Sequence, residues 1–188
     1  MMKKKKKIIF GLFSLILCFC LIVCSIDTEN DDNSNNESIK VIGVYYNEDD
    51  KTVNPEDGVE RNWINVVYEI NNQTDENWKD DFFWSSDSNT LTIGSNDYEY
   101  DKGTDGLAIL YGFSVPSKNS EIWAGAKLTY LVRFVVNQSD IKKEMEGKFK
   151  VEYNGKIYTY EFNYDDLTPY TEETMIELSK NLNINKTK

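Results

Sequence analysis

Oxygen ligands of the kind that calcium prefers are grouped in one short stretch of this sequence. Asp97, Asp101 and Asp105 recur at every fourth position, with Asn96 and Thr104 beside them. Carboxylate, amide and hydroxyl oxygens suit a hard divalent cation. The spacing differs from that of the helix-flanked calcium loop, however, and the bidentate glutamate that closes that loop is missing. The stretch therefore indicates either a calcium site or a solvated acidic turn, and the turn needs fewer assumptions.

Aromatic rings are the second group with possible chemistry, because a flat ring can stack on the apolar face of a sugar. The chain has four tryptophans and twelve tyrosines. Such side chains also fill the cores of β-sandwiches, which is their simpler role. Trp78 and Trp123 are the best candidates for a ligand surface, since their neighbours Asn77 and Gly125 place them at expected loop edges.

The absence of histidine restricts the chemistry of this chain. There is no histidine, and the three cysteines are Cys18, Cys20 and Cys24, all near the N-terminus. The usual zinc, copper, haem and iron–sulfur ligand sets are therefore missing beyond residue 24, as are Cys–His and Ser–His–Asp nucleophile systems. A carboxylate pair could hydrolyse a glycosidic bond, but 32 acidic residues single out no pair. We expect no catalytic residue, no cofactor and no enzyme, with a small glycoside hydrolase as an alternative.

The N-terminal segment predicts export across a membrane. Lys3 to Lys7 precede an apolar run from Ile8 to Ile26, and positive charge before such a run stays on the cytoplasmic side. Leu21-Ile22-Val23-Cys24 resembles the lipobox of bacterial lipoproteins, although Val23 stands where small residues are the rule. The resemblance implies lipid attachment at Cys24. An uncleaved anchor and full secretion are the alternatives, because the run is just long enough to span a bilayer.

Charge restricts the partners of the exported part. Without the five leader lysines, 16 basic residues stand against 32 acidic ones, which gives a formal charge of −16. Nucleic acid and anionic lipid would both be repelled. The stretch Asp27–Ser38 is polar and acidic throughout, so we expect it to be a solvated linker.

From Ile39 onwards, short alternating stretches of aromatic and β-branched residues predict β-strands. In Trp63–Asn71 the residues Asn65 and Glu69 are expected to face outward, as are Thr129 and Arg133 in a later strand. The absence of helical crossovers favours an antiparallel two-sheet sandwich of the immunoglobulin-like type. The expected strands are Ile39–Tyr46, Trp63–Asn71, Phe82–Ser85, Thr90–Gly94, Leu107–Val115, Lys127–Val136, Lys148–Tyr153 and Lys156–Asn163.

Two local signals are specific. Asn154-Gly155 predicts a two-residue hairpin that sets Tyr153 opposite Lys156 and Phe149 opposite Tyr160. Thr168-Pro169 predicts the N-cap and first residue of a short amphipathic helix that runs to about Asn181. The expected organisation is a leader or anchor at 1–24, a linker at 25–38, a sandwich at 39–165 and a helix with a frayed tail at 166–188.

Three stretches carry a resemblance to a family. Asn65–Thr74, Phe82–Asp87 continuing to Tyr98, and Ala124–Lys127 continuing to Val136 resemble uncharacterised immunoglobulin-like extracellular lipoprotein domains of Gram-positive bacteria. The likeness covers about Ile39–Tyr164. It implies a sandwich fold and an envelope location, but no activity and no functional residue.

Together these features predict a membrane-tethered, extracellular, non-enzymatic binding or adaptor domain of the bacterial cell envelope. Its expected partner is another envelope protein. A module that binds cell-wall glycan through exposed tryptophans is the first alternative, and the carboxylate-dependent hydrolase is the second.

Overall fold

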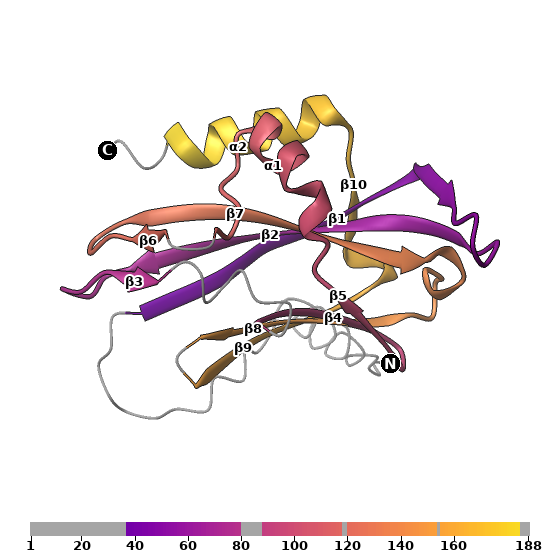
Figure 1. Cartoon of the computed structure of the whole chain (residues 1–188), viewed down its shortest axis with the longest axis horizontal. Helices are drawn as coiled ribbons and strands as arrows, with labels where there is room; N and C mark the ends of the chain where they lie inside the picture. Colours follow the sequence, from indigo (N-terminus) through magenta and orange to yellow (C-terminus); the bar gives the residue numbers. More distant parts are fainter. Residues whose placement is uncertain (1–36, 80–87, 118–119, 154, 185–188) are drawn as a thin grey trace, which may run out of the picture. The chain divides into compact units, whose positions relative to one another are not determined.

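The computed structural model describes residues 37–79, 88–117, 120–153 and 155–184 (Figure 1). The chain divides into two units, Met1–Asn33 and Ser34–Lys188. The leader, Cys24 and most of the expected linker lie outside the described residues, as does the expected strand Phe82–Ser85. No helix in the described ranges combines the length and the apolar character needed to cross a bilayer.

Two four-stranded sheets form the framework of the second unit. The first has the order β10 (Leu167–Pro169), β1 (Glu37–Val53), β2 (Glu60–Asn72) and β7 (Lys127–Asn137). The second has the order β5 (Asn96–Glu99), β4 (Asn89–Ile93), β8 (Glu146–Tyr153) and β9 (Lys156–Asn163). A short ladder joins β3 (Trp78–Lys79) to β6 (Glu121–Ile122). Among the strands that the structure describes, every pairing is antiparallel except that of β10 with β1, so the predicted all-β antiparallel sandwich is confirmed.

The core between the sheets follows the expected alternation of the strands. On β2 the inward set includes Ile64, Val66 and Ile70, and all of them are fully buried. Tyr68 of β2 stacks on Tyr130 of β7 with ring centroids 5.5 Å apart, and it meets Phe149 of the other sheet at 5.7 Å. These aromatic contacts bridge the two sheets.

The predicted hairpin is also confirmed. Tyr153 pairs with Lys156 and Phe149 with Tyr160, as counted from the turn. Gly155 has a φ of +74°, which suits the two-residue turn that glycine favours. Asn154 lies outside the described residues.

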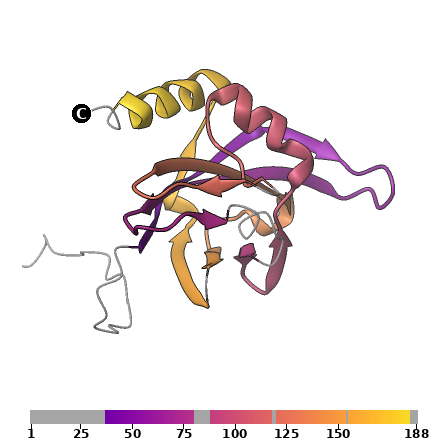
Figure 2. The same cartoon turned by 60° about the vertical axis from the view of Figure 1, so that its left-hand side comes forward.

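A layer of helices covers the other face of the first sheet, and the sequence did not predict this layer in full (Figures 1 and 2). The expected strand Leu107–Val115 is wrong, because residues Asp105–Tyr111 form helix α1. Asp101 accepts a hydrogen bond from the Gly103 amide and caps the preceding 3-10 turn η3 (Lys102–Thr104). Gly112, with a φ of +89°, follows the last residue of α1.

The C-terminal helix α2 (Glu172–Ile184) begins later than expected. Thr168 and Pro169 instead belong to β10 and pair in parallel with Tyr45 and Tyr46. Thr171 takes over as the cap, since its hydroxyl accepts a hydrogen bond from the Thr174 amide. Edge pairing therefore prevails over the local helix signal.

The helix layer reverses an expectation about side-chain direction. Asn65, Thr129 and Arg133 were expected to face solvent, but all three are buried. They share their sheet face with Val67 and Leu131, which pack with Met175 of α2 and Ala108 of α1. Glu69 on the same face is half-buried and pairs with Lys127 at 2.8 Å. The first sheet is thus covered on both faces.

Candidate binding surface and buried polar cluster

Trp123 is a large aromatic side chain on a firmly held turn. It is 71% exposed, whereas Ile122 beside it is fully buried. The turn closes where the Ala126 amide donates to the Trp123 carbonyl at 2.9 Å, and Gly125 adopts a φ of +75°. The Gly125 amide also donates to the Asn72 carbonyl at 2.7 Å, so β2 fixes the turn.

The side chain of Asn72 holds this turn from inside the molecule. Its Nδ2 donates to the carbonyl oxygens of Glu76, Ile122 and Trp123 at 2.9, 3.0 and 3.1 Å. Its Oδ1 accepts from the amide and the hydroxyl of Thr74 at 3.1 and 2.6 Å. A buried carboxamide with all these partners fixes both loops that meet at the end of β2.

The other tryptophan that sequence reasoning singled out has a different role. Trp78 is only 4% exposed, so its ring is not presented to solvent. It stacks on Tyr153 with centroids 4.7 Å apart, and its Nε1 donates to the Thr74 hydroxyl. Trp78 lies close to Trp123 in the fold, because it pairs with Ile122. Trp78 thus supports the turn, and Trp123 carries the exposed ring.

Polar side chains hold the residues on either side of Trp123. Asn77 donates from Nδ2 to Glu121 at 2.9 Å and accepts from the Ala124 amide at 3.0 Å. Both side chains belong to exposed residues. An exposed aromatic side chain on a turn that also carries fixed amide and carboxylate groups is suited to a ligand that has both apolar and hydroxyl surfaces.

The three acidic residues considered for calcium do not converge. Asp97 accepts from the Thr92 hydroxyl, Asp101 caps a turn, and Asp105 accepts from the Tyr100 hydroxyl. Burial raises the pKa of Asp105, although the bond from Tyr100 acts in the opposite direction. Within the described ranges no group of three acidic, cysteine or histidine residues could hold a metal ion.

A second carboxylate, Asp140, has several donors around it at the end of the turn η4 (Gln138–Asp140). The Tyr98 hydroxyl donates to it, as does Asn96 Nδ2 at 2.8 Å. Burial acts to raise the pKa of Asp140, but the hydrogen bonds from Tyr98, Asn96 and Ser139 outweigh it and lower the pKa below its ordinary value. Burial and the bond to Asp140 raise the pKa of Tyr98 to about 12.

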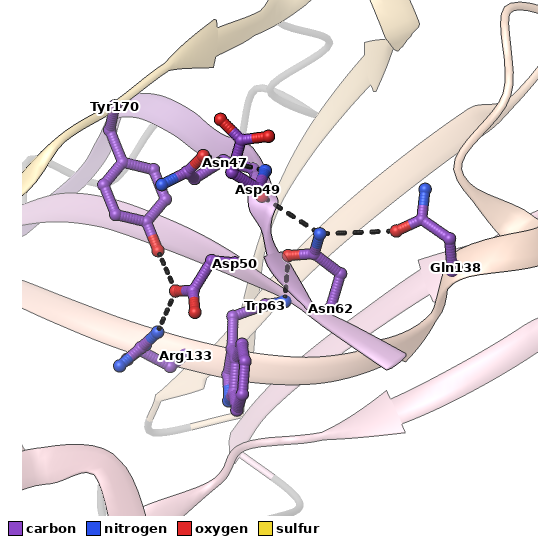
Figure 3. Close-up of polar contacts among 8 residues, drawn as sticks. All are labelled: Asn47, Asp49, Asp50, Asn62, Trp63, Arg133, Gln138 and Tyr170. Carbon is purple, nitrogen blue, oxygen red and sulfur yellow. Dashed lines mark hydrogen bonds and ion pairs between the residues drawn. The ribbon is translucent and has the colours of Figure 1, made fainter. Parts of the chain in front are cut away.

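A buried arginine lies on the face of the first sheet that carries Val67 and Leu131, and Figure 3 shows its contact with Asp50. Arg133 of β7 is 4% exposed, and its NH2 group is 3.5 Å from Oδ2 of Asp50. The same oxygen accepts from the Tyr170 hydroxyl at 3.2 Å. The Trp63 ring lies 5.4 Å from the Arg133 guanidinium carbon, which is within cation–π range. Three strands and the residue that follows β10 thus meet around one cation.

Several polar atoms in this cluster lack partners. Arg133 Nε, Trp63 Nε1 and both polar atoms of Asn65 are buried without a hydrogen bond of normal geometry among the described residues. Asn65 is fully buried and pairs with Arg133 across the β2–β7 ladder. A buried donor without an acceptor lowers the free energy of unfolding by about 1–3 kcal/mol, so such a group needs an explanation.

The positive charge of Arg133 acts on the pKa values of two tyrosines, Tyr170 and Tyr111. Burial raises the pKa of Tyr170, and the nearby Arg133 and the Asn65 carboxamide act against that rise. Burial likewise raises the pKa of Tyr111 at the end of α1, again opposed by Arg133. Sequence reasoning missed this cluster. The available signal was that Asn65 and Arg133 interrupt a face that also carries Val67 and Leu131, which an amphipathic helix would be expected to cover.

Comparisons with known proteins find solved structures of low sequence identity. No protein-family model matches the chain, and no curated protein matches it significantly. An uncharacterized β-sandwich protein from Clostridium difficile 630 aligns with 69% of this chain and 82% of its own, at 13% identity and a TM-score of 0.37. A functionally unknown protein from Listeria monocytogenes EGD-e aligns with 72% of this chain and 90% of its own, at 11% identity and a TM-score of 0.40. The immunoglobulin-like, extracellular and lipoprotein aspects of the sequence resemblance stay predictions.

Proposed function

We propose that this chain is a membrane-tethered, extracellular binding domain of the cell envelope that has no catalytic activity and contacts its partner through Trp123. The observation that carries the proposal is the exposed Trp123 ring on a turn whose backbone Asn72 fixes. A rigid aromatic anchor loses little conformational entropy when it is buried in a complex, which is why tryptophan is enriched among the residues that dominate binding energy.

The position of Trp123 supports this role. The described part of the chain begins at Glu37, which pairs with Asn72. The polar linker therefore joins the domain at the same end of β2 that holds the Trp123 turn. We therefore expect the partner to include components near the point where the linker joins the domain.

A direct test replaces Trp123 by a photoreactive amino acid in the full chain and irradiates intact cells. We expect one discrete cross-linked envelope protein. The matched control is Leu110 of α1, which is 73% exposed and also apolar, and it should give no such product. Equal labelling from both positions, or none from Trp123, would contradict the proposal.

Glycan binding is a second candidate, favoured by the polar side chains Asn77 and Glu121, which are bonded to each other at the turn that carries Trp123. In that case the full chain should be retained on purified peptidoglycan, and Trp123→Ala should abolish retention while Leu110→Ala preserves it. Retention that is insensitive to Trp123→Ala would exclude this mode of binding.

The absence of catalysis is tested separately with chromogenic glycosides. We expect no turnover above the uncatalysed rate. Turnover that a single acidic-to-amide substitution abolishes would favour the hydrolase instead.

A further inference from the structure

We propose that Arg133, with Trp63 and Asn65, forms a carboxylate-binding site that Asp50 of the same chain occupies in this structure. The proposal is independent of the Trp123 surface. It begins from the cation itself, because a buried guanidinium needs an anion and filled hydrogen bonds to offset the loss of water.

The contact with Asp50 leaves this need incompletely met. The separation of 3.5 Å exceeds the roughly 2.7–2.9 Å of a charge-assisted hydrogen bond. Asp50 also reaches only the NH2 group, whereas Nε stays without a partner. A carboxylate that is free to move could engage Nε and NH2 together in the bidentate geometry that arginine favours.

The surroundings of Arg133 add further donors. Trp63 Nε1 is buried without a hydrogen bond on the same sheet face, and Asn65 Nδ2, two positions further along β2, makes no hydrogen bond of normal geometry among the described residues. The Tyr170 hydroxyl already donates to the Asp50 carboxylate. These groups match an incoming carboxylate, whose oxygens only accept hydrogen bonds.

The backbone that carries Asp50 provides a route for exchange. In the β1–β2 ladder, Tyr46 pairs with Ile64 and Lys51 pairs with Asn62, so Asn47–Asp50 bulge out opposite Trp63 alone. The bulge is held by Asn62 Nδ2, which donates to the Asn47 carbonyl at 3.0 Å (Figure 3). Asp50 has a side chain 40% exposed. It can therefore withdraw without the loss of a ladder hydrogen bond.

The experiment removes the internal carboxylate and supplies one from solution. In the full chain in detergent, Asp50→Asn should raise the unfolding equilibrium constant roughly tenfold or more, because Arg133 loses its counter-ion. Sodium acetate should reverse this rise saturably, whereas sodium chloride at equal ionic strength should not. Asp49→Asn is the matched control, since it removes the same charge from the same bulge without a contact to Arg133.

A spectroscopic readout makes the test independent of stability. In Asp50→Asn, acetate should shift the indole N–H signal of Trp63, assigned through Trp63→Phe, and the Nε–H signal of Arg133. Wild-type chain should respond only at much higher acetate, because Asp50 competes. Inorganic phosphate serves as the second probe, and tighter binding of phosphate would overturn the assignment to a carboxylate. An equal effect of chloride, or no saturable shift, would show that water alone fills the unpaired donors and would refute the site.

Discussion

Asn65 and Asn72 on strand β2 are equally buried but differ in what their amides do. Asn72 donates to three carbonyl oxygens and accepts from Thr74, so both ends of its carboxamide are satisfied. Asn65 has no partner of normal geometry at either end among the described residues. The hydrogen bonds of Asn72 stabilise the fold. The carboxamide of Asn65 would become more favourable if a ligand or a water molecule supplied its missing hydrogen bonds.

Replacement of Asn72 by alanine should therefore be costly. The change leaves three carbonyl oxygens and the Thr74 amide without their buried partner, and we expect a loss of roughly 2–4 kcal/mol in the free energy of unfolding. Urea denaturation followed by tryptophan fluorescence measures this loss. Gln73→Ala, at the exposed next position, should change stability by less than about 0.5 kcal/mol. A similar small effect for Asn72→Ala would contradict the role assigned to this side chain.

The acid sensitivity of the domain should depend on Asp140. Its pKa is lowered in the folded state, so the stability it contributes is present above its unfolded pKa of about 3.9 and is lost as pH falls through the folded value. Asp140→Asn should lower the free energy of unfolding at neutral pH. Below about pH 4 the free energy of unfolding of this variant should fall less steeply with pH than that of the wild type. Urea midpoints across this range test the effect, with the exposed Asp75→Asn as control. An unchanged acid profile would rule out this contribution.

Among the elements, strands were easier to predict than the faces that they bury. The alternation in β2 and β7 identified the inner face, and turn chemistry gave the β8–β9 register residue by residue. The residues of β2 and β7 do not show whether their second face is exposed to water or covered by helices. Arg133 looked like a surface residue because only the docking of α1 and α2 makes its position internal.

The error at residues 107–115 has a similar cause. A run such as Leu107-Ala108-Ile109-Leu110 contains no period that separates a short helix from a buried strand. The deciding signals lie on either side, where Asp101 caps the preceding turn and Gly112 adopts a positive φ. The Asp50–Arg133 contact was likewise beyond prediction, because it depends on a bulge that no local pattern marks.

Two glycines make a paired test of the element packing. A Cβ at Gly147 of β8 would overlap the Phe162 ring, whereas a Cβ at Gly106 of α1 would meet nothing within 4 Å. We expect Gly147→Ala to lower the free energy of unfolding by about 1–3 kcal/mol. Gly106→Ala should raise it by about 0.4–1 kcal/mol. Thermal unfolding of the two variants should show midpoints that move in opposite directions. Equal shifts would indicate that the packing of β8 against β9 is looser than described.

At the scale of the whole molecule, the part of the chain beyond residue 24 has to be stable without disulfides. All three cysteines precede residue 25, so the sandwich depends on its aromatic core and on the helix layer. Its high negative charge would be repelled by anionic lipid, so the tethering that we propose requires a covalent anchor.

Cys24 should decide where the protein is found. If the predicted lipobox is used, the membrane-extracted protein has the mass of residues 24–188 plus a diacylglyceryl-type modification. Cys24→Ser should then retain the leader or release the protein, depending on whether cleavage still occurs. Intact mass spectrometry of membrane and medium fractions distinguishes these outcomes. An unmodified full-length mass in the wild-type membrane fraction would instead establish the uncleaved anchor.

The parallel pairing of β10 with β1 has a consequence for biogenesis. Val44, Tyr45 and Tyr46 of β1 pair with Leu167–Pro169, so this part of the strand gains its second neighbour only from residues more than 120 positions later in the sequence. If the chain is exported from its N-terminus onward, as we propose, these three residues of β1 would lack their second neighbour until Leu167–Pro169 had also crossed the membrane. A chain truncated shortly before Leu167 should therefore aggregate or be degraded by quality-control proteases.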